Sequence, residues 1–145
     1  MYPHRIRLRG PWECEPLARF VFGDDGQKQE ITTHLPAPKK MTMPCRWSEA
    51  GLSDFTGRVR FRRRFGYPGR IDENERVWLT FAGVEEKAEI RLNGQFLGRQ
   101  VGDQPWEFDV TKLLAVRNNL RVDVESESPR GGLWGEVALE IREAD

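Results

Sequence analysis

The sequence predicts an all-β fold, built as a β-sandwich or a small barrel. Seven or more short segments alternate apolar and polar residues at spacings near ten residues, which is typical of strands with one buried face. Helical periodicity is nearly absent. The length of 145 residues matches the usual size of one domain, about 100–150 residues. Because no linker or internal repeat divides the chain, we expect residues 1–145 to form a single domain.

The alternating segments give the expected strands in order along the chain. Alternation is weaker near the N-terminus and stronger from Arg58 onward. Between two of the stronger segments, Asn93-Gly94 predicts a hairpin turn, because both residues tolerate positive φ. The expected strands lie around residues 6–8, 12–14, 20–22, 58–65, 76–81, 88–92, 96, 106–110, 120–124 and 137–141.

The connections between these strands follow from Gly, Pro and Asp content. Segments 23–30, 36–57 and 66–76 are expected to be loops. Within the first, Gly23-Asp24-Asp25-Gly26 predicts a turn in preference to a calcium loop. One short helical turn is expected after Asp109, with Thr111 as the N-cap residue.

The charges balance overall but are unevenly distributed. The chain has 23 basic and 23 acidic side chains, and residues 1–70 hold fourteen of the former and seven of the latter. Zero net charge argues against a dedicated nucleic-acid-binding protein. No apolar run approaches the roughly 18 residues of a membrane span. The start MYPHRIRLRGPW lacks the apolar stretch of a secretory signal, so we expect a cytoplasmic protein that binds neither nucleic acid nor membrane.

The residues that usually carry catalysis or metal binding are sparse. His4 and His34 are the two histidines, and Cys14 and Cys45 are the two cysteines; their spacing fits no zinc site. We expect two separate buried thiols in preference to a disulfide bond. The chain has no G-x-S-x-G elbow and no Gly-rich phosphate loop, and no acidic pair distinguishes an acid from a base. No cofactor or metal is therefore expected.

One expected strand is rich in arginine. Its guanidinium groups form either a nucleic-acid-binding surface or the solvent face of a strand whose charges pair with acids on neighbouring strands. We favour the second interpretation, with Asp123 and Glu125, or Glu136 and Glu140, as the partners. The arginines are Arg58, Arg60, Arg62, Arg63 and Arg64.

Arg63 differs from the other arginines of this strand. It shares the face of Val59, Phe61 and Phe65 and would therefore point toward the core. A charge in that position is expected either in a buried ion pair or at the end of the core, facing a cleft.

Aromatic residues provide a second route to a binding site. Sugar rings present apolar C–H faces that stack on tryptophan, while their hydroxyls need planar polar partners. Trp47, Trp106 and Trp134 lie at junctions between loops and strands, where either sugar stacking or ordinary burial is expected. Trp12 and Trp78 are expected to be packing residues.

Several motifs, taken in order, resemble one known family. GRVRFRRRF resembles the G-x-V-x-Y-R-R-x-F strand of the sugar-binding domain of glycoside hydrolase family two, the β-galactosidase and β-glucuronidase group. AEIRLNGQFLG resembles its A-x-V-x-L-N-G-x-x-L-G hairpin, and PWEFDVTKLL its P-F-E-F-D-I-T-x-x-L segment. GGLWGEVALE resembles its closing G-G-I-W-x-x-V-x-L-E. The resemblance covers residues 41–142.

This resemblance implies a jelly-roll β-sandwich of the galactose-binding-domain-like type. Early and late strands interleave in a jelly roll, so the basic half of the chain is expected beside the acidic half. In the family, this domain precedes an immunoglobulin-like domain and a (β/α)₈ barrel that carries the catalytic carboxylates. Such a barrel needs about 250 residues. We therefore expect a stand-alone, non-catalytic, carbohydrate-binding-like module.

The resemblance also suggests where a sugar would bind. In some family members, the segment after the L-x-V-x-V strand contacts the substrate; residues 126–132 occupy its place here. Ser126 or Glu127 stands where those members have Asp, and Gly135 stands where Arg is common. The candidate carbohydrate-binding residues are Trp106, Trp134, Arg63, Asp103, Glu127 and Arg130.

A second function remains open at this point. The chain could be a structural or protein-interaction module, or an accessory subunit of a separately encoded glycosidase, with no glycan ligand of its own. The expected partner is accordingly either a glycan or another protein.

Overall fold

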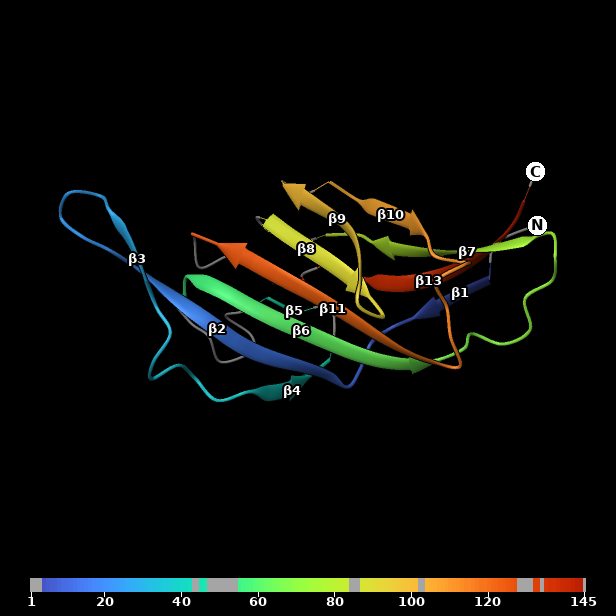
Figure 1. The fold of residues 1–145 in the computed structure, drawn as a ribbon, viewed down its shortest axis with the longest axis horizontal. Helices are drawn as coiled ribbons and strands as arrows, with labels where there is room; N and C mark the ends of the chain where they lie inside the picture. The colour runs from blue at the N-terminus through green and yellow to red at the C-terminus, as the bar shows by residue number, and fades with distance from the viewer. Residues whose placement is uncertain are drawn as a thin grey trace.

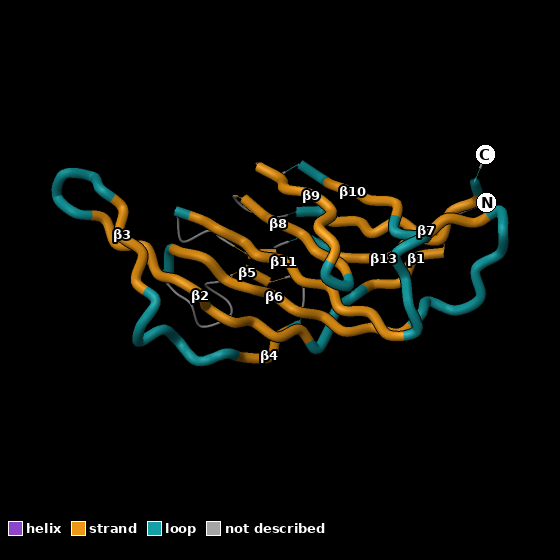
Figure 2. Tube along the Cα trace, in the orientation of Figure 1, coloured by secondary structure: helices purple, strands orange, loops and turns teal. Residues whose placement is uncertain are grey.

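The strands form two main sheets and one short pair. The computed structural model describes residues 4–42, 45–46, 55–83, 87–101, 104–127, 132–133 and 135–144, and every regular element within these ranges is a strand (Figures 1 and 2). The strands are β1 (His4–Arg7), β2 (Trp12–Phe22), β3 (Lys28–Ile31), β4 (Lys39–Met41), β5 (Cys45–Arg46), β6 (Gly57–Gly66), β7 (Glu75–Phe81), β8 (Lys87–Leu92), β9 (Gln95–Val101), β10 (Trp106–Asp109), β11 (Arg117–Ser126), β12 (Gly132–Leu133) and β13 (Val137–Glu143).

The order of strands within the sheets confirms an all-β sandwich. The larger sheet runs β3-β2-β6-β11-β8-β9, with β4 also paired to β2. The smaller sheet runs β1-β13-β7-β10, and β12 pairs with β5. All of these pairings are antiparallel. Because β11 lies between β6 and β8, and β13 beside β1, early and late parts of the sequence are interleaved, as expected for a jelly roll.

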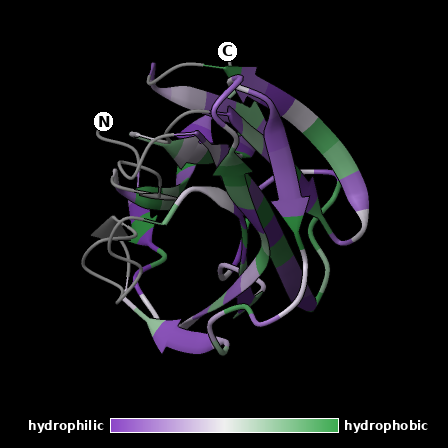
Figure 3. Ribbon diagram, turned by 90° about the vertical axis from the view of Figure 1, so that its left-hand side faces the viewer, coloured by the Kyte–Doolittle hydropathy of each residue, from purple (hydrophilic) through white to green (hydrophobic). Residues whose placement is uncertain are grey.

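The core lies between the two main sheets. Alternate residues of the longer strands β2, β7 and β11 are buried, and bands of apolar and polar residues are visible along the strands in Figure 3. Val59 and Phe61 of β6 face Leu79 and Phe81 of β7 within one cluster of buried side chains. Trp12 is fully buried, and its indole Nε1 donates a 2.7 Å hydrogen bond to the carbonyl of Leu8. Trp12 is therefore a packing residue, as predicted.

Three short strands lie in segments that the sequence assigned to loops. β3 begins within 23–30 and ends at Ile31, and β4 and β5 fall within 36–57. The side chains of β3 are all exposed, so this strand has no buried face to produce an alternating pattern. The predicted turn at Gly23–Gly26 is confirmed, because the amide of Gly26 donates to the carbonyl of Gly23 at 2.9 Å. It joins β2 to β3.

The short turn expected after Asp109 is present, but its cap is a different residue from the one expected. Residues 111–113 form a single turn in which the amide of Leu113 donates to the carbonyl of Val110 at 2.9 Å. Asp109, and not Thr111, caps this turn: its Oδ1 accepts hydrogen bonds from the amide and hydroxyl of Thr111 at 3.1 and 2.7 Å. The Thr111 hydroxyl oxygen in turn accepts from the amide of Val77 at 2.8 Å, so the turn is bound to β7.

The Asn93-Gly94 hairpin is confirmed and is held in place by amide groups. Asn93 and Gly94 have φ values of 52° and 83°. Asn93 Nδ2 donates to Asn118 Oδ1 at 3.0 Å, and Asn93 Oδ1 accepts from the amide of Asn119 at 2.8 Å. Asn118 is only 1% exposed. The hairpin between β8 and β9 is thus fixed to the start of β11.

The structure describes the side chain of only one of the two cysteines. Cys14 is buried in the core on β2, as expected for a thiol that packs as a small apolar group. The side chain of Cys45 lies outside the described residues, so the two-thiol state stays a prediction.

Candidate functional site

One half of the arginine strand is neutralised by its neighbours. Arg60 of β6 is the register partner of Asp123 on β11. Its Nε donates to Asp123 Oδ1 at 2.9 Å and its Nη2 to Oδ2 at 3.2 Å. Arg58 likewise reaches Glu125 on β11 at 3.1 Å. This confirms the cross-strand interpretation for Arg58 and Arg60, with Asp123 and Glu125 as the partners.

The alternative partners, Glu136 and Glu140, were wrong. Both lie at or beside β13, which belongs to the smaller sheet. There they bind Arg5 of β1, whose guanidinium lies 2.9 Å from Glu136 and 2.6 Å from Glu140. The basic N-terminal half of the sequence thus lies beside the acidic C-terminal half in both sheets, which accounts for the uneven charge distribution.

The other half of the arginine strand lacks such compensation. Arg62 of β6 is the register partner of Arg121 on β11, and Arg121 is the register partner of Arg91 on β8. Three guanidinium groups therefore lie in one row across three adjacent strands. Beyond Arg62 the row continues through Glu13 of β2 to Lys40 of β4.

Each arginine of this row forms an ion pair that is longer than that of Arg60, and the acid is never its register partner. The Arg62–Glu15, Arg121–Asp123 and Arg91–Glu89 distances are 3.5, 3.6 and 3.5 Å. Asp123 already binds Arg60 with two hydrogen bonds. The row consequently carries excess positive charge.

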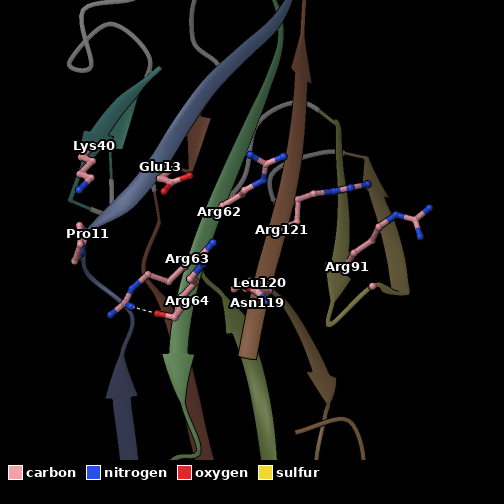
Figure 4. A pocket seen from close by; sticks show the side chains of 11 residues that line it. Pro11, Glu13, Lys40, Arg62, Arg63, Arg64, Arg91, Asn119, Leu120 and Arg121 are labelled. Atoms are coloured by element: carbon pink, nitrogen blue, oxygen red, sulfur yellow. Dashed lines mark hydrogen bonds between the residues drawn. The ribbon is translucent and has the colours of Figure 1, made fainter. Parts of the chain in front are cut away.

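These side chains line a groove of about 500 Å³, which we call the arginine groove (Figure 4). Its side chains come from β2, β4, β6, β8 and β11. Gly94 of the hairpin lies at its edge. Among the described residues its lining includes one carboxylate, that of Glu13, and six cations, those of Lys40, Arg62, Arg63, Arg64, Arg91 and Arg121.

A second groove on the same sheet has balanced charge. It measures about 400 Å³, and we call it the neutral groove. Its described charged residues are three cations and three carboxylates, namely Arg58, Lys87, Arg99, Glu89, Asp123 and Glu125. The contrast shows that the excess positive charge of the arginine groove is not shared by every groove on the sheet.

Arg63 takes the second of its two expected positions, at the end of the core beside a groove. Its Nη1 donates to the backbone carbonyl of Arg64 (Figure 4). Its Nε is buried and has no hydrogen-bond acceptor, and no carboxylate pairs with it among the residues described. Burial lowers the pKa of Arg63 below its usual range, yet a guanidinium remains charged at physiological pH.

Arg91 has the same unsatisfied atom. Its Nε is also buried without an acceptor, while its guanidinium carbon lies 5.5 Å from the centre of the Phe96 ring. Two of the six cations that line the arginine groove thus contain a donor that the described chain leaves unpaired.

Trp106 does not reach this groove. It is half-buried on β10, with its ring centre 4.4 Å from that of Phe108 and 6.4 Å from that of Phe81. A Cβ placed on Gly98 of β9 would lie 2.8 Å from Trp106 Cζ2. The ring therefore packs between the edge strands of the two sheets, which is the burial role that the sequence left open.

Glu127 lies far from Arg63. It follows β11, is exposed, and forms a 3.2 Å ion pair with Lys28 of β3. Arg63 pairs with Leu120, whereas Ser126 pairs with Gly57, and six residues of strand separate these points by about 20 Å. The described candidates Trp106, Glu127 and Arg63 do not form one site. Trp134, Asp103, Arg130 and Trp47 lie outside the described residues.

Gly135 has a structural reason to differ from the Arg common in the resembled family. Its backbone lies against Gly83, to whose carbonyl its amide donates at 3.0 Å. A Cβ on Gly135 would lie 2.0 Å from the nitrogen of Gly83. No side chain fits there without movement of the backbone.

Sequence reasoning missed three of the six cations that line the groove: Lys40, Arg91 and Arg121. Strand alternation already placed Arg91 and Arg121 on the polar face of their segments. Their convergence depends on which strands are neighbours and in which register, and the alternating pattern contains neither.

Trp78 lies on an outer face of the smaller sheet, where the guanidinium carbon of Arg142 lies 5.0 Å from the centre of its ring.

Two searches over the described residues were negative. No group of three or more His, Cys, Asp or Glu side chains is placed to hold a metal ion in that part of the chain. No helix there is long and apolar enough to cross a membrane.

Comparison with known proteins identifies the family. Residues 30–132 match the sequence profile described as glycosyl hydrolase 2 galactose-binding domain-like. The β-galactosidase large subunit of Latilactobacillus sakei is 30% identical over 127 residues, which are 86% of this chain and 18% of that protein. A β-glucuronidase of Formosa agariphila is 24% identical over 127 residues, which are 78% of this chain and 13% of that protein.

Solved structures show the same fold. The β-glucuronidase of Bifidobacterium dentium, complexed with coumarin-3-O-glucuronide, matches with a TM-score of 0.78 and 22% identity over 99% of this chain and 31% of that one. A β-glucuronidase from an uncultured Clostridium sp. matches with a TM-score of 0.71 and 23% identity over 98% of this chain and 29% of that one. The chain spans less than a fifth of the curated relatives described above. Its profile match covers most of its length, and the chain therefore belongs to the glycosyl hydrolase 2 galactose-binding domain-like family.

Proposed function

We propose that these 145 residues form a non-catalytic glycan-binding domain and that the arginine groove is its binding surface. The observation that carries this proposal is the row Arg62–Arg121–Arg91, which lines a groove on the open face of a sheet. Planar guanidinium groups bind pairs of acceptor oxygens with two parallel hydrogen bonds. Sugars present such pairs as neighbouring hydroxyls and as carboxylates.

Two acids of the described chain have the lowered pKa of ion-pair partners and not the raised pKa of a proton donor. Glycoside hydrolysis uses two carboxyl groups, one of them with a raised pKa so that it can donate a proton. Here a hydrogen bond from Arg142 holds the pKa of Glu107 below its ordinary value. Burial opposes ionisation of Asp109, but hydrogen bonds from Thr111 and Arg76 outweigh it and lower its pKa as well. Both groups stay ionised and act as ion-pair partners.

Isothermal titration of the 145-residue chain with neutral and acidic oligosaccharides tests the proposal. We expect saturable binding to at least one saccharide, weakened in R62Q/R121Q. The matched control K87Q/R99Q also removes two positive charges, but from the neutral groove, and is expected to bind like the parent. Absence of saccharide binding at tens of millimolar ligand contradicts the proposal, as does equal weakening in both variants.

A second candidate function is docking to the remainder of a glycoside hydrolase. It is favoured by the β2–β3 hairpin, which extends beyond the ends of the neighbouring strands in Figure 1. This arm exposes Val21, Phe22 and Ile31, each 37–45% accessible, and a two-stranded hairpin is only marginally stable alone in water.

Covering the arm with another part of a longer enzyme would remove these apolar side chains from water. Co-purification from the source organism tests this function. Recovery of the chain with a catalytic glycosidase polypeptide, lost in V21S/F22S, is the expected result. Recovery as a lone monomer contradicts it.

A further inference from the structure

The arginine row places like charges side by side, and its ion pairs with Glu15, Asp123 and Glu89 are longer, at 3.5–3.6 Å, than the 2.9 Å pair between Arg60 and Asp123. Like charges directly opposite each other on neighbouring strands are destabilising. The Arg62–Arg121 and Arg121–Arg91 pairs are both of this kind. One step along the same strands, Arg60 faces Asp123, so the sheet does accommodate alternating charge. A fold selected for stability alone would continue that alternation.

The buried donors point in the same direction. Arg63 Nε and Arg91 Nε are removed from water without an acceptor, and an unpaired buried polar group is costly. Both residues line the arginine groove. Because these two buried atoms are out of a ligand's reach, they add only to the cost of placing arginines here, and an anionic ligand would act on the more exposed side chains of Arg62, Arg91 and Arg121, which are 34–46% accessible.

The groove fits a ligand with several anionic groups in a line. Neighbouring strands lie about 4.8 Å apart, so Arg62, Arg121 and Arg91 present three positive charges at steps close to the length of one pyranose unit. Lys40 and Glu13 continue the row on the other side. A single small anion would neutralise only part of this row.

We propose that the arginine groove recognises an acidic oligosaccharide, whose carboxylate or sulfate groups pair with Arg62, Arg121 and Arg91. This inference rests on the proposed glycan-binding function and specifies its ligand class. Carboxylate and sulfate groups both present pairs of acceptor oxygens that one guanidinium binds with two parallel hydrogen bonds.

A single-stranded nucleic acid fits the groove less well. Sequence-independent binding of single strands combines positive charge with aromatic side chains on which the bases stack. The residues that line the arginine groove include no aromatic side chain among those described. The chain also has zero formal net charge, which gives no long-range attraction for a polyanion. The local row therefore favours a short acidic saccharide.

The test titrates the 145-residue chain with a defined oligogalacturonate and with its methyl ester, which has the same sugar backbone without the charges. A heparin-derived oligosaccharide separates sulfate from carboxylate recognition. Polyglutamate and oligo(dT) probe the two other classes of polyanion. Each probe is measured against the parent, R62Q/R121Q and the charge-matched control K87Q/R99Q, at low and at physiological salt.

The expected result is binding of the oligogalacturonate or the heparin fragment, with the ester bound at least tenfold more weakly. R62Q/R121Q is expected to lose roughly tenfold or more in affinity, since charge-assisted hydrogen bonds are removed, while K87Q/R99Q is unchanged. Higher salt weakens the binding by screening.

The contrary outcomes separate the two proposals. Equal binding of the acid and the ester overturns acidic recognition but leaves the glycan-binding function standing. Binding of polyglutamate or oligo(dT) with no saccharide bound overturns acidic saccharide recognition, and so does the absence of binding to every probe; the glycan-binding function falls as well only if the neutral oligosaccharides also fail to bind. Binding of acidic saccharides that is equally strong in R62Q/R121Q places the site elsewhere and overturns the assignment to this groove.

Discussion

Arg62 and Arg121 are register partners across β6 and β11, and no carboxylate lies opposite either of them on these two strands. Two residues earlier on β6, Arg60 faces Asp123 with two hydrogen bonds of 2.9 and 3.2 Å. One strand pair therefore changes from opposite-charge to like-charge pairing within a single step of the pleat.

Replacing the like-charge pair should not harm folding. In R62Q/R121Q, repulsion between neighbouring strands is removed while the glutamine side chains keep most of the packing. We expect the free energy of unfolding to stay the same or to rise by up to about 1 kcal/mol. Urea denaturation measures it. A loss of more than about 1 kcal/mol would show that these arginines stabilise the sheet.

Neutralising the opposite-charge pair should have the reverse effect. Asp123 is 13% exposed and accepts two hydrogen bonds from Arg60. We expect D123N to lower the free energy of unfolding by about 1–2 kcal/mol, because charge-assisted hydrogen bonds are lost at a half-buried site. E73Q changes an exposed acid in the loop before β7 and serves as the control. Equal unfolding curves for D123N and the parent would contradict this account of the charge distribution.

The close contact at Gly135 makes a steric prediction. A Cβ at this position would lie 2.0 Å from the backbone nitrogen of Gly83. G135A must therefore displace the backbone at Gly83 or at residue 135, two segments that are joined by a hydrogen bond. We expect a loss of about 1–3 kcal/mol, the usual cost of overpacking. In G66A the added methyl group meets only the carbonyl oxygen of Val116, at 3.9 Å. Thermal unfolding of the two variants should differ clearly; similar midpoints contradict the predicted clash.

Low pH should lower the free energy of unfolding, partly because Asp109 becomes protonated. Its pKa is lower in the folded chain than its ordinary value of 3.8, so folding favours the ionised form. This contribution is complete above the ordinary pKa and is lost as the pH falls through the folded value. We expect D109N to be less stable than the parent at pH 7, with a smaller difference at pH 2.5. Urea midpoints at both pH values test this, and a constant difference contradicts it.

Local patterns predicted the strands whose side chains alternate between core and solvent. Arg58–Phe65 and Arg76–Phe81 were recognisable because Val59, Phe61, Leu79 and similar residues recur at every second position. β3 was missed because Lys28–Ile31 has no buried face, and its pairing with β2 alone makes it a strand. The turn after Asp109 was predicted, but its cap was misassigned to Thr111, because the Thr111 hydroxyl instead donates to Asp109 and accepts from the amide of Val77.

The candidate site was predictable only in part, for a different reason. Alternation determines which face a side chain occupies, so Arg62, Arg91 and Arg121 could each be placed on an outer face. Their meeting in one row is set by the order β6-β11-β8 and by the register of three strands. Arg63 was singled out because a charge in an inward position is unusual, and it lies beside the groove. Trp106 was a reasonable sugar-stacking candidate, but its ring packs between the sheets.

The most direct test of the central claim observes the arginine side chains themselves. In an NMR titration of the 145-residue chain with oligogalacturonate, the Nε–Hε signals of Arg62, Arg91 and Arg121 should shift together and saturate. The signals of Arg58 and Arg60, already bound to Glu125 and Asp123, should stay in place. Shifts confined to Arg58 and Arg60, or no shift at the three groove arginines, would contradict the account.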